Sequence, residues 1–189
     1  MAVKIGHASL DENGKASGGS AGDQTKKEVC TRNWYNKPWT SVLRPNDSSV
    51  AEKIATAMEQ ACANDNIGYD QYQRNTLYAE ATKFGFDVSK VEKDVECDCS
   101  ALVRVCCAYA GILGLPEGFR TTNEPKNLMA TGAFLEMAGD QYTKQSAYLK
   151  AGDILCTPVQ GHTVIVLKKV APTPAKFPRR YAKIKQNPL

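Results

Sequence analysis

Hydrophobic residues recur at helical spacing in three parts of the chain. The first set follows Asp47-Ser48-Ser49, a run of helix-capping residues, and continues to about residue 64; its apolar members are Val50, Ile54, Ala57, Met58 and Ala61. A second set predicts a helix over about 72–84 that stops at Gly85. A third helix is predicted to begin at or near Cys99 and to end at Gly111, because glycine commonly ends helices.

After residue 130 the pattern changes from helical spacing to short apolar runs. Residues 133–137, 152–156 and 163–167 each predict a strand, and the last of them, TVIVL, is apolar and β-branched. Helices that precede strands in this way predict an α+β domain, with the helices packed on a small antiparallel β-sheet.

The N-terminal residues 1–46 are predicted to be a loop-rich part of the same domain. Residues 11–27, DENGKASGGSAGDQTKK, offer almost nothing to bury. The aromatic residues of the next segment, Trp34, Tyr35 and Trp39, are predicted to pack in the core rather than to form a carbohydrate platform or a lid. One domain is expected over residues 1–170, followed by a Pro-rich basic linker or tail over residues 171–189.

Composition places the chain among ordinary globular proteins: 42% of its 189 residues are hydrophobic and 23% are charged. A net charge of +4 is well short of the Lys/Arg tracts of nucleic-acid-binding proteins, although it favours an anionic partner. No run approaches the roughly 20 apolar residues that span a bilayer, and the N-terminus lacks the apolar core of a secretory signal. We therefore expect a cytosolic protein whose seven cysteines stay reduced.

The segment ECDCSALVRVCCAYAG, residues 96–111, holds a cluster of cysteines. A zinc site is disfavoured, because its ligands usually lie in C-x(2–4)-C pairs, whereas here the spacings are Cys97-x-Cys99 and Cys106-Cys107. Adjacent side chains on a helix also point about 100° apart. We expect no metal and no cofactor. Core packing is the predicted role of most of the other cysteines, namely Cys62, Cys106, Cys107 and Cys156.

Cys99 differs because it lies where a polar segment becomes an apolar helix. Unpaired backbone N–H groups and the helix dipole favour a thiolate there, and a backbone N–H could help to hold an oxyanion. A thiol nucleophile also needs a base, and the chain has only two histidines. His162 follows Gly161 at the start of an apolar strand, where it would face a cleft. The order of a helix-borne cysteine and a strand-borne histidine is that of papain-like enzymes.

Three motifs in this order resemble the NlpC-type, papain-like cell-wall peptidases. Residues 98–103, DCSALV, resemble the D-C-S-G-L-V signature; residues 150–155, KAGDIL, resemble the G-D strand; residues 161–166, GHTVIV, resemble the G-H strand. GHASLDENGKASGGSAGDQTKKEVCTRNWYNKPW together with CDCSALV is similar, more narrowly, to endolysins of phages and prophages of Gram-positive bacteria. The resemblance covers residues 1 to about 168 and implies a papain-like cysteine peptidase fold.

Carried over to this chain, the resemblance makes Cys99 the nucleophile and His162 the base. Tyr69, in the sequence Ile67-Gly68-Tyr69, would supply an oxyanion-binding or substrate-binding hydroxyl. The third polar residue that the family normally has on the strand after the base is missing. The candidates to replace it as the group that orients His162 are His7 and Asp23.

Two neighbours of the nucleophile complete the candidate site. Asp98 is expected to cap the helix or to bind a substrate amine rather than to transfer a proton. Ser100, which follows Cys99, is grouped with Asp98 as a substrate-binding or orienting residue.

The expected function is that of an endolysin, a cysteine-dependent peptidoglycan hydrolase. It would cleave a peptide bond of the wall stem peptide, often the one after γ-D-glutamate, or of the cross-bridge, through a thioester. Two alternatives stay open: an N-acetylmuramoyl-L-alanine amidase that uses the same Cys/His pair, and a non-catalytic cell-wall-binding module. A calcium-dependent lysin is disfavoured, because Asp65-Asn66-Ile67-Gly68 lacks the acidic spacing of a calcium loop. We expect a monomer that stays in the cytoplasm until lysis and then acts on peptidoglycan.

Overall fold

The computed structural model describes residues 2–157 and 161–168. The linker or tail predicted for residues 171–189 lies outside the described residues. Within them the protein is a mixture of helices and strands that is compatible with the predicted α+β class.

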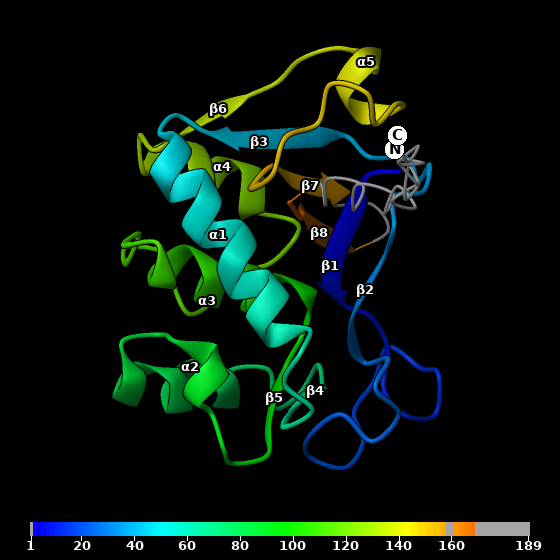
Figure 1. The fold of residues 1–189 in the computed structure, drawn as a ribbon, viewed down its shortest axis with the longest axis vertical. Helices are drawn as coiled ribbons and strands as arrows, with labels where there is room; N and C mark the ends of the chain where they lie inside the picture. Colours follow the sequence, from blue (N-terminus) through cyan, green and yellow to red (C-terminus); the bar gives the residue numbers. More distant parts are fainter. Residues whose placement is uncertain (1, 158–160, 169–189) are drawn as a thin grey trace, which may run out of the picture.

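A six-stranded antiparallel sheet forms the centre of the molecule, in the strand order β2–β1–β8–β7–β3–β6 (Figure 1). The three predicted strands are confirmed as β6, β7 and β8. The strands span Lys4–Ala8 (β1), Val29–Asn33 (β2), Ser41–Pro45 (β3), Phe134–Glu136 (β6), Ile154–Thr157 (β7) and His162–Val166 (β8).

The prediction that residues 1–46 are loop-rich is wrong for three segments, because β1, β2 and β3 all come from this part of the chain. Each is only five residues long. Gly6 and His7 interrupt the apolar pattern of β1, and β2 ends in the polar residues 31–33. These strands are stabilised by their partners in the sheet rather than by their own composition. Residues 9–28, between β1 and β2, contain no helix or strand, in agreement with the loop predicted there.

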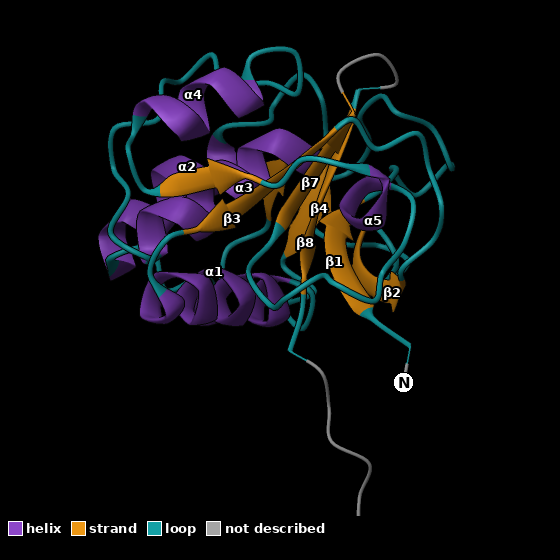
Figure 2. Ribbon diagram, turned by 90° about the horizontal axis from the view of Figure 1, so that it is seen from above, coloured by secondary structure: helices purple, strands orange, loops and turns teal. Residues whose placement is uncertain are grey.

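Five α-helices accompany the sheet in the described residues, and Figure 2 shows α1 to α4 on one side of it and α5 on the other. The helices predicted first and third are confirmed as α1 and α3. The second begins later than predicted, because Asp70 accepts hydrogen bonds from the N–H groups of Tyr72 and Gln73 and so forms a turn. The helices span Ser48–Ala61 (α1), Thr76–Ala81 (α2), Cys99–Tyr109 (α3), Glu124–Ala130 (α4) and Asp140–Thr143 (α5), with short 3-10 helices at Thr82–Phe84 and Val88–Lys90.

Apolar side chains cover both faces of the sheet. Ile165 of β8 belongs to the larger core beneath α1 and α3, whereas its neighbours Val164 and Val166 belong to a second core that contains Trp39. Successive side chains of a strand point to opposite faces. The unbroken apolar sequence of β8 is therefore explained by burial on both sides.

A small parallel pair of strands positions the start of α3. β4, Ile67–Tyr69, pairs with β5, Val95–Cys97, and β5 leads directly into α3. Tyr69 lies opposite Cys97 in this pair, which brings it close to Cys99 in spite of their separation along the chain. The loop of residues 9–28 is fastened to the same pair, since the Gly22 N–H donates to Glu96 Oε1 at 2.9 Å.

Candidate active site

Cys99 is the first residue of α3, and only 6% of its surface is exposed. The helix packs against β8 and β1, so that the thiol faces the start of β8. The Cys99 S–H donates to the Gly161 carbonyl oxygen at 3.8 Å. The two segments that the sequence assigns to the nucleophile and the base therefore lie in direct contact.

A buried network holds the turn that precedes Cys99. Asp98 caps α3, because its Oδ1 accepts from the Ala101 N–H at 2.7 Å, which confirms the capping role expected for it. The Arg74 guanidinium donates to both carboxylate oxygens of Asp98 and, at 2.8 Å, to the Ser100 hydroxyl. Asp98 and Ser100 are thus engaged with Arg74, and neither lines the pocket beside His162.

The resting form of Cys99 is the neutral thiol. Burial, then the negative charges of Asp98 and Glu124, raise the pKa of Cys99 to about 12, although hydrogen bonds from the N–H groups of Thr163 and Ser100 act in the opposite direction. The expectation that the helix N-terminus favours a thiolate is therefore wrong for the free protein. The helix dipole is outweighed because the sulfur lies in a nearly dry site next to carboxylates.

His162 opens β8, directly after Gly161. Gly161 has a φ of 56°, in the left-handed region, and a Cβ there would meet only ordinary contacts. The turn requires a glycine because of this backbone conformation, and not because a side chain would lack room. Trp39 stacks on the His162 ring, with 6.2 Å between the ring centroids. Burial, then the charges of Lys37 and Arg32, lower the pKa of His162 to about 4, so the imidazole is neutral.

His7 is the residue that the fold brings to His162. It lies on β1, next to β8, and its Nδ1 is 2.9 Å from His162 Nε2. Its other nitrogen, Nε2, lies 3.8 Å from Cys30 Sγ. Burial, followed by the charges of His162 and Arg32, lowers the pKa of His7 to about 3. Two neutral imidazoles therefore lie side by side, and the N–H of one of them donates to the other.

Asp23, the other residue considered for orienting His162, has a different place. Its carboxylate accepts hydrogen bonds from four backbone N–H groups of its own loop, those of Thr25, Lys27, Glu28 and Val29. It organises the turn that leads into β2 and does not line the pocket beside His162.

A pocket of about 350 Å³ opens beside His162. Tyr69, the residue that the resemblance makes a substrate-binding or oxyanion-binding hydroxyl, lines it, and its hydroxyl accepts from Gln71 Nε2 at 3.1 Å. Burial raises the pKa of both Tyr69 and Tyr35, and a negative charge on Cys99 would raise it further. The lining residues are His7, Ser9, Leu10, Ala16, Arg32, Tyr35, Lys37, Tyr69, Gln71, Gly161 and His162.

β2 and the residues that follow it supply a part of this pocket that the sequence did not indicate. Trp39 does pack in the core as predicted, yet it also covers His162, and Arg32, Tyr35 and Lys37 line the cleft. The density of aromatic residues over 34–39 was the available signal. It could not be tied to the site because β2 itself was not predicted.

Glu124, at the start of α4, was also missed. Its side chain is fully buried behind the Cys/His pair, where its Oε1 accepts from the Thr163 hydroxyl at 2.6 Å and its Oε2 has no partner among the described residues. Burial raises the pKa of Glu124 to about 8. A carboxyl group in such a site is protonated at neutral pH.

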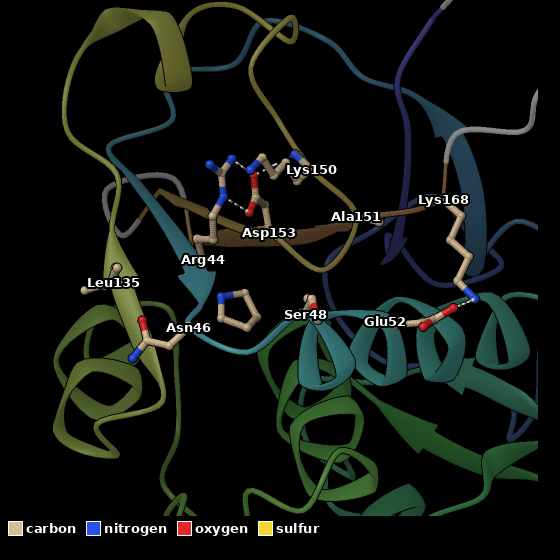
Figure 3. A pocket seen from close by; sticks show the side chains of 11 residues that line it. Arg44, Asn46, Ser48, Glu52, Leu135, Lys150, Ala151, Asp153 and Lys168 are labelled. Atoms are coloured by element: carbon tan, nitrogen blue, oxygen red, sulfur yellow. Dashed lines mark hydrogen bonds and ion pairs between the residues drawn. The ribbon is translucent and has the colours of Figure 1, made fainter.

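The G-D motif has a structural role. The Asp153 carboxylate is fully buried and receives two hydrogen bonds from Arg44, the pair drawn in Figure 3. Gly152 has a φ of 85°, and a Cβ there would lie 2.4 Å from the Ala51 carbonyl oxygen of α1. A pocket of about 540 Å³ beside this pair, between the start of α1, β3 and β6, does not include Cys99 or His162.

The described residues offer no group of three or more His, Cys, Asp or Glu side chains that could hold a metal ion. Among the same residues, no helix combines the length and the apolar character that a membrane span requires. The arrangement holds the Cys99 thiol against Gly161, the residue before His162, and His162 lines a polar pocket with positive charge.

Comparison with known proteins gave one match to a family. The sequence model of a family described as an endolysin-like domain matches residues 5–172. Neither the curated proteins nor the solved structures include a significant match to this chain.

Proposed function

The chain belongs to the endolysin-like domain family, which supports a cell-wall lytic function, and from this premise we propose that it is a cysteine-dependent peptidoglycan hydrolase. In this proposal Cys99 attacks a peptide carbonyl in the stem peptide or cross-bridge of the bacterial cell wall. The fold would then be a papain-like variant, with the thiol on a helix and the imidazole on a strand of an antiparallel sheet.

One observation carries the proposal: the fold brings together three residues that lie far apart in the sequence. Cys99 contacts Gly161 at the start of β8, His162 follows it, and His7 of β1 touches His162 at 2.9 Å. Nucleophile, base and a group that orients the base form the constellation that thiol catalysis requires.

The tautomers of the two histidines determine whether the pair can work. If His162 Nε2–H donates to His7 Nδ1, then His162 Nδ1 carries a lone pair and can take the proton of Cys99. If the proton instead lies on His7 Nδ1, His162 carries its proton on Nδ1 and cannot act as a base. We therefore assign His7 the role of acceptor, which takes the place of the family's missing third residue.

The reaction begins from the neutral pair. Cys99 S–H passes its proton to His162 as the sulfur attacks the carbonyl carbon, and the resulting imidazolium gives that proton to the leaving amine. This leaves a thioester on Cys99. Water then attacks the thioester with His162 as the base, which releases the acid product and restores the thiol. The Tyr69 hydroxyl and the backbone N–H at the start of α3 are the proposed oxyanion donors.

The test uses Cys99→Ala protein and purified cell walls from Gram-positive species. Wild type is expected to clear the suspension and to release new amino groups, whereas Cys99→Ala does neither. Mass spectrometry of the products identifies the bond, and a product with free muramic acid carboxyl and L-alanine amine groups would point to the amidase.

Cys107→Ala is the matched control, because it removes a fully buried thiol of the same helix that packs in the larger hydrophobic core. It is expected to lyse walls like wild type. Lysis by Cys99→Ala that equals the wild-type rate would overturn the proposal. Binding to walls by wild type without release of amino groups would favour the wall-binding module.

A further inference from the structure

The pocket beside His162 carries two positive side chains and no acidic one. Arg32, on β2, and Lys37, in the segment that follows, line it together with tyrosines and a glutamine. Neither cation forms an ion pair with a carboxylate within residues 2–157 and 161–168. Other cations of the protein are paired, for example Arg44 with Asp153 and Arg74 with Asp98.

Arg32 is exposed, yet its position is defined. Its guanidinium carbon lies 4.5 Å from the centroid of the Tyr35 ring, in cation–π geometry. Arg32 belongs to β2, an edge strand of the sheet, and both Arg32 and Tyr35 line the pocket. A guanidinium held flat on an aromatic ring keeps its edge N–H groups available for a ligand.

The two charges also act on the base. Burial is the largest cause of the low pKa of His162, and the charges of Lys37 and Arg32 lower it further, so they oppose formation of the imidazolium that the proposed mechanism requires. An anion bound between them would remove much of this repulsion. A substrate with a carboxylate at this position would therefore make His162 a stronger base at the moment when it is needed.

We propose that Arg32 and Lys37 form a subsite for a free carboxylate of the substrate, so that the enzyme selects acidic stem peptides over their carboxamide counterparts. The inference rests on the proposed function for its substrate, a wall peptide, and adds which chemical form of that peptide is cleaved. Charge-assisted hydrogen bonds to a carboxylate are about twice as strong as those to a neutral amide. Discrimination of roughly 10- to 100-fold in kcat/KM is expected.

The experiment compares two synthetic stem peptides that differ only in one group: γ-linked D-glutamate with a free α-carboxylate, or D-isoglutamine with the carboxamide. Wild type is expected to cleave the carboxylate peptide roughly 10- to 100-fold better. Arg32→Met and Lys37→Met each lower kcat/KM for the carboxylate peptide, and the double variant cleaves both peptides at similar rates. Methionine keeps the apolar contact with Tyr35 and removes the charge.

Lys53→Met is the matched control, because it removes one positive charge from the exposed face of α1, outside the pocket. It is expected to retain the full preference for the carboxylate peptide. Loss of preference in this variant would assign the effect to the overall charge and would overturn the subsite. Equal cleavage of the two peptides by wild type would overturn it as well.

Failure of the proposed function has a different signature. If wild type cleaves neither peptide and Cys99→Ala lyses walls as well as wild type, then catalysis by Cys99 is wrong. Calorimetric binding of the two peptides to Cys99→Ala protein still decides the subsite in that case. Tighter binding of the carboxylate form, abolished by Lys37→Met, supports it, and equal binding of both forms overturns it.

Discussion

The hydrogen bond between His7 Nδ1 and His162 Nε2 forces a choice of tautomer on both rings, since only one proton lies between them. In the proposed mechanism, an acceptor at the position of His7 Nδ1 keeps Nδ1 of His162, the nitrogen that takes the Cys99 proton, free of a proton. His7→Asn retains such an acceptor, because the amide oxygen of Asn occupies nearly the same place, whereas His7→Leu fills the space without one.

We therefore predict that His7→Leu lowers kcat by about 100-fold or more with little change in KM, and that His7→Asn loses much less. Steady-state kinetics on a wall peptide measure both constants. Equal losses in the two variants would mean that His7 only fills space beside His162, and the thermal unfolding of each variant shows whether it is folded.

At the scale of elements, the start of α3 depends on the buried pair between Asp98 and Arg74. Their side chains are only 10% and 5% exposed, so removal of one charge leaves the other buried without a partner. Asn caps a helix about as well as Asp, which separates the cap from the charge.

Asp98→Asn is accordingly predicted to lower the free energy of unfolding by about 3 kcal/mol or more. Urea denaturation measures it. Asp47→Asn is the matched control, because Asp47 is the exposed N-cap of α1 and has no arginine partner among the described residues. A similar loss in both variants would show that capping, rather than the buried pair, accounts for the effect.

The same elements show what the sequence could predict. α1 and α3 could be predicted from the sequence, because a capping aspartate precedes each of them and their apolar residues recur at helical spacing. β1 could not be predicted, because its five residues include Gly6 and His7 and its stability comes from pairing with β2 and β8. Local patterns report local preferences, and a strand that depends on distant partners leaves little trace in its own residues.

The candidate site was predictable to the same extent. Cys99 and His162 each lie at the boundary of an element with a clear pattern, and motifs carry them. The sequence left His7 and Asp23 as candidates to orient His162, and β1 places His7 beside it. The charges of Arg32 and Lys37 follow from β2 at the edge of the sheet and could not be inferred without it. The neutral state of the Cys99 thiol depends on burial and then on the charge of Asp98, and burial follows from the packing of the whole domain.

At the scale of the whole molecule, two buried histidines and two buried glutamates make stability depend on pH. Burial lowers the pKa of His7 and His162 from 6.5 to about 3 and about 4, so their contribution is present above pH 6.5 and is lost as the pH falls. Burial raises the pKa of Glu96 and Glu124 from 4.5 to about 8, so their contribution is present below pH 4.5 and is lost as the pH rises toward 8. Stability from these groups is greatest between about pH 4.5 and 6.5.

Glu124→Gln imitates the protonated side chain. It is therefore predicted to remove the loss of stability that ionisation of Glu124 causes as the pH rises, while the loss caused by Glu96 remains. Between pH 5 and pH 8 the variant should lose less unfolding free energy than wild type, by about 2 kcal/mol or more. Thermal or urea unfolding at both pH values measures this difference. Glu92→Gln, the same change at an exposed position, should follow wild type, and parallel curves for Glu124→Gln and wild type would contradict the prediction.

The pairing of β1 with β8 has a consequence for the timing of activity. His7 lies near one end of the chain and His162 near the other, and the two meet only when the first strand and the last strand of the sheet lie side by side. A nascent chain that has been synthesised only as far as β7 therefore lacks His162, the proposed base, and the contact of His7 with it. Under the proposed mechanism, the site is completed in the same step that pairs β1 with β8.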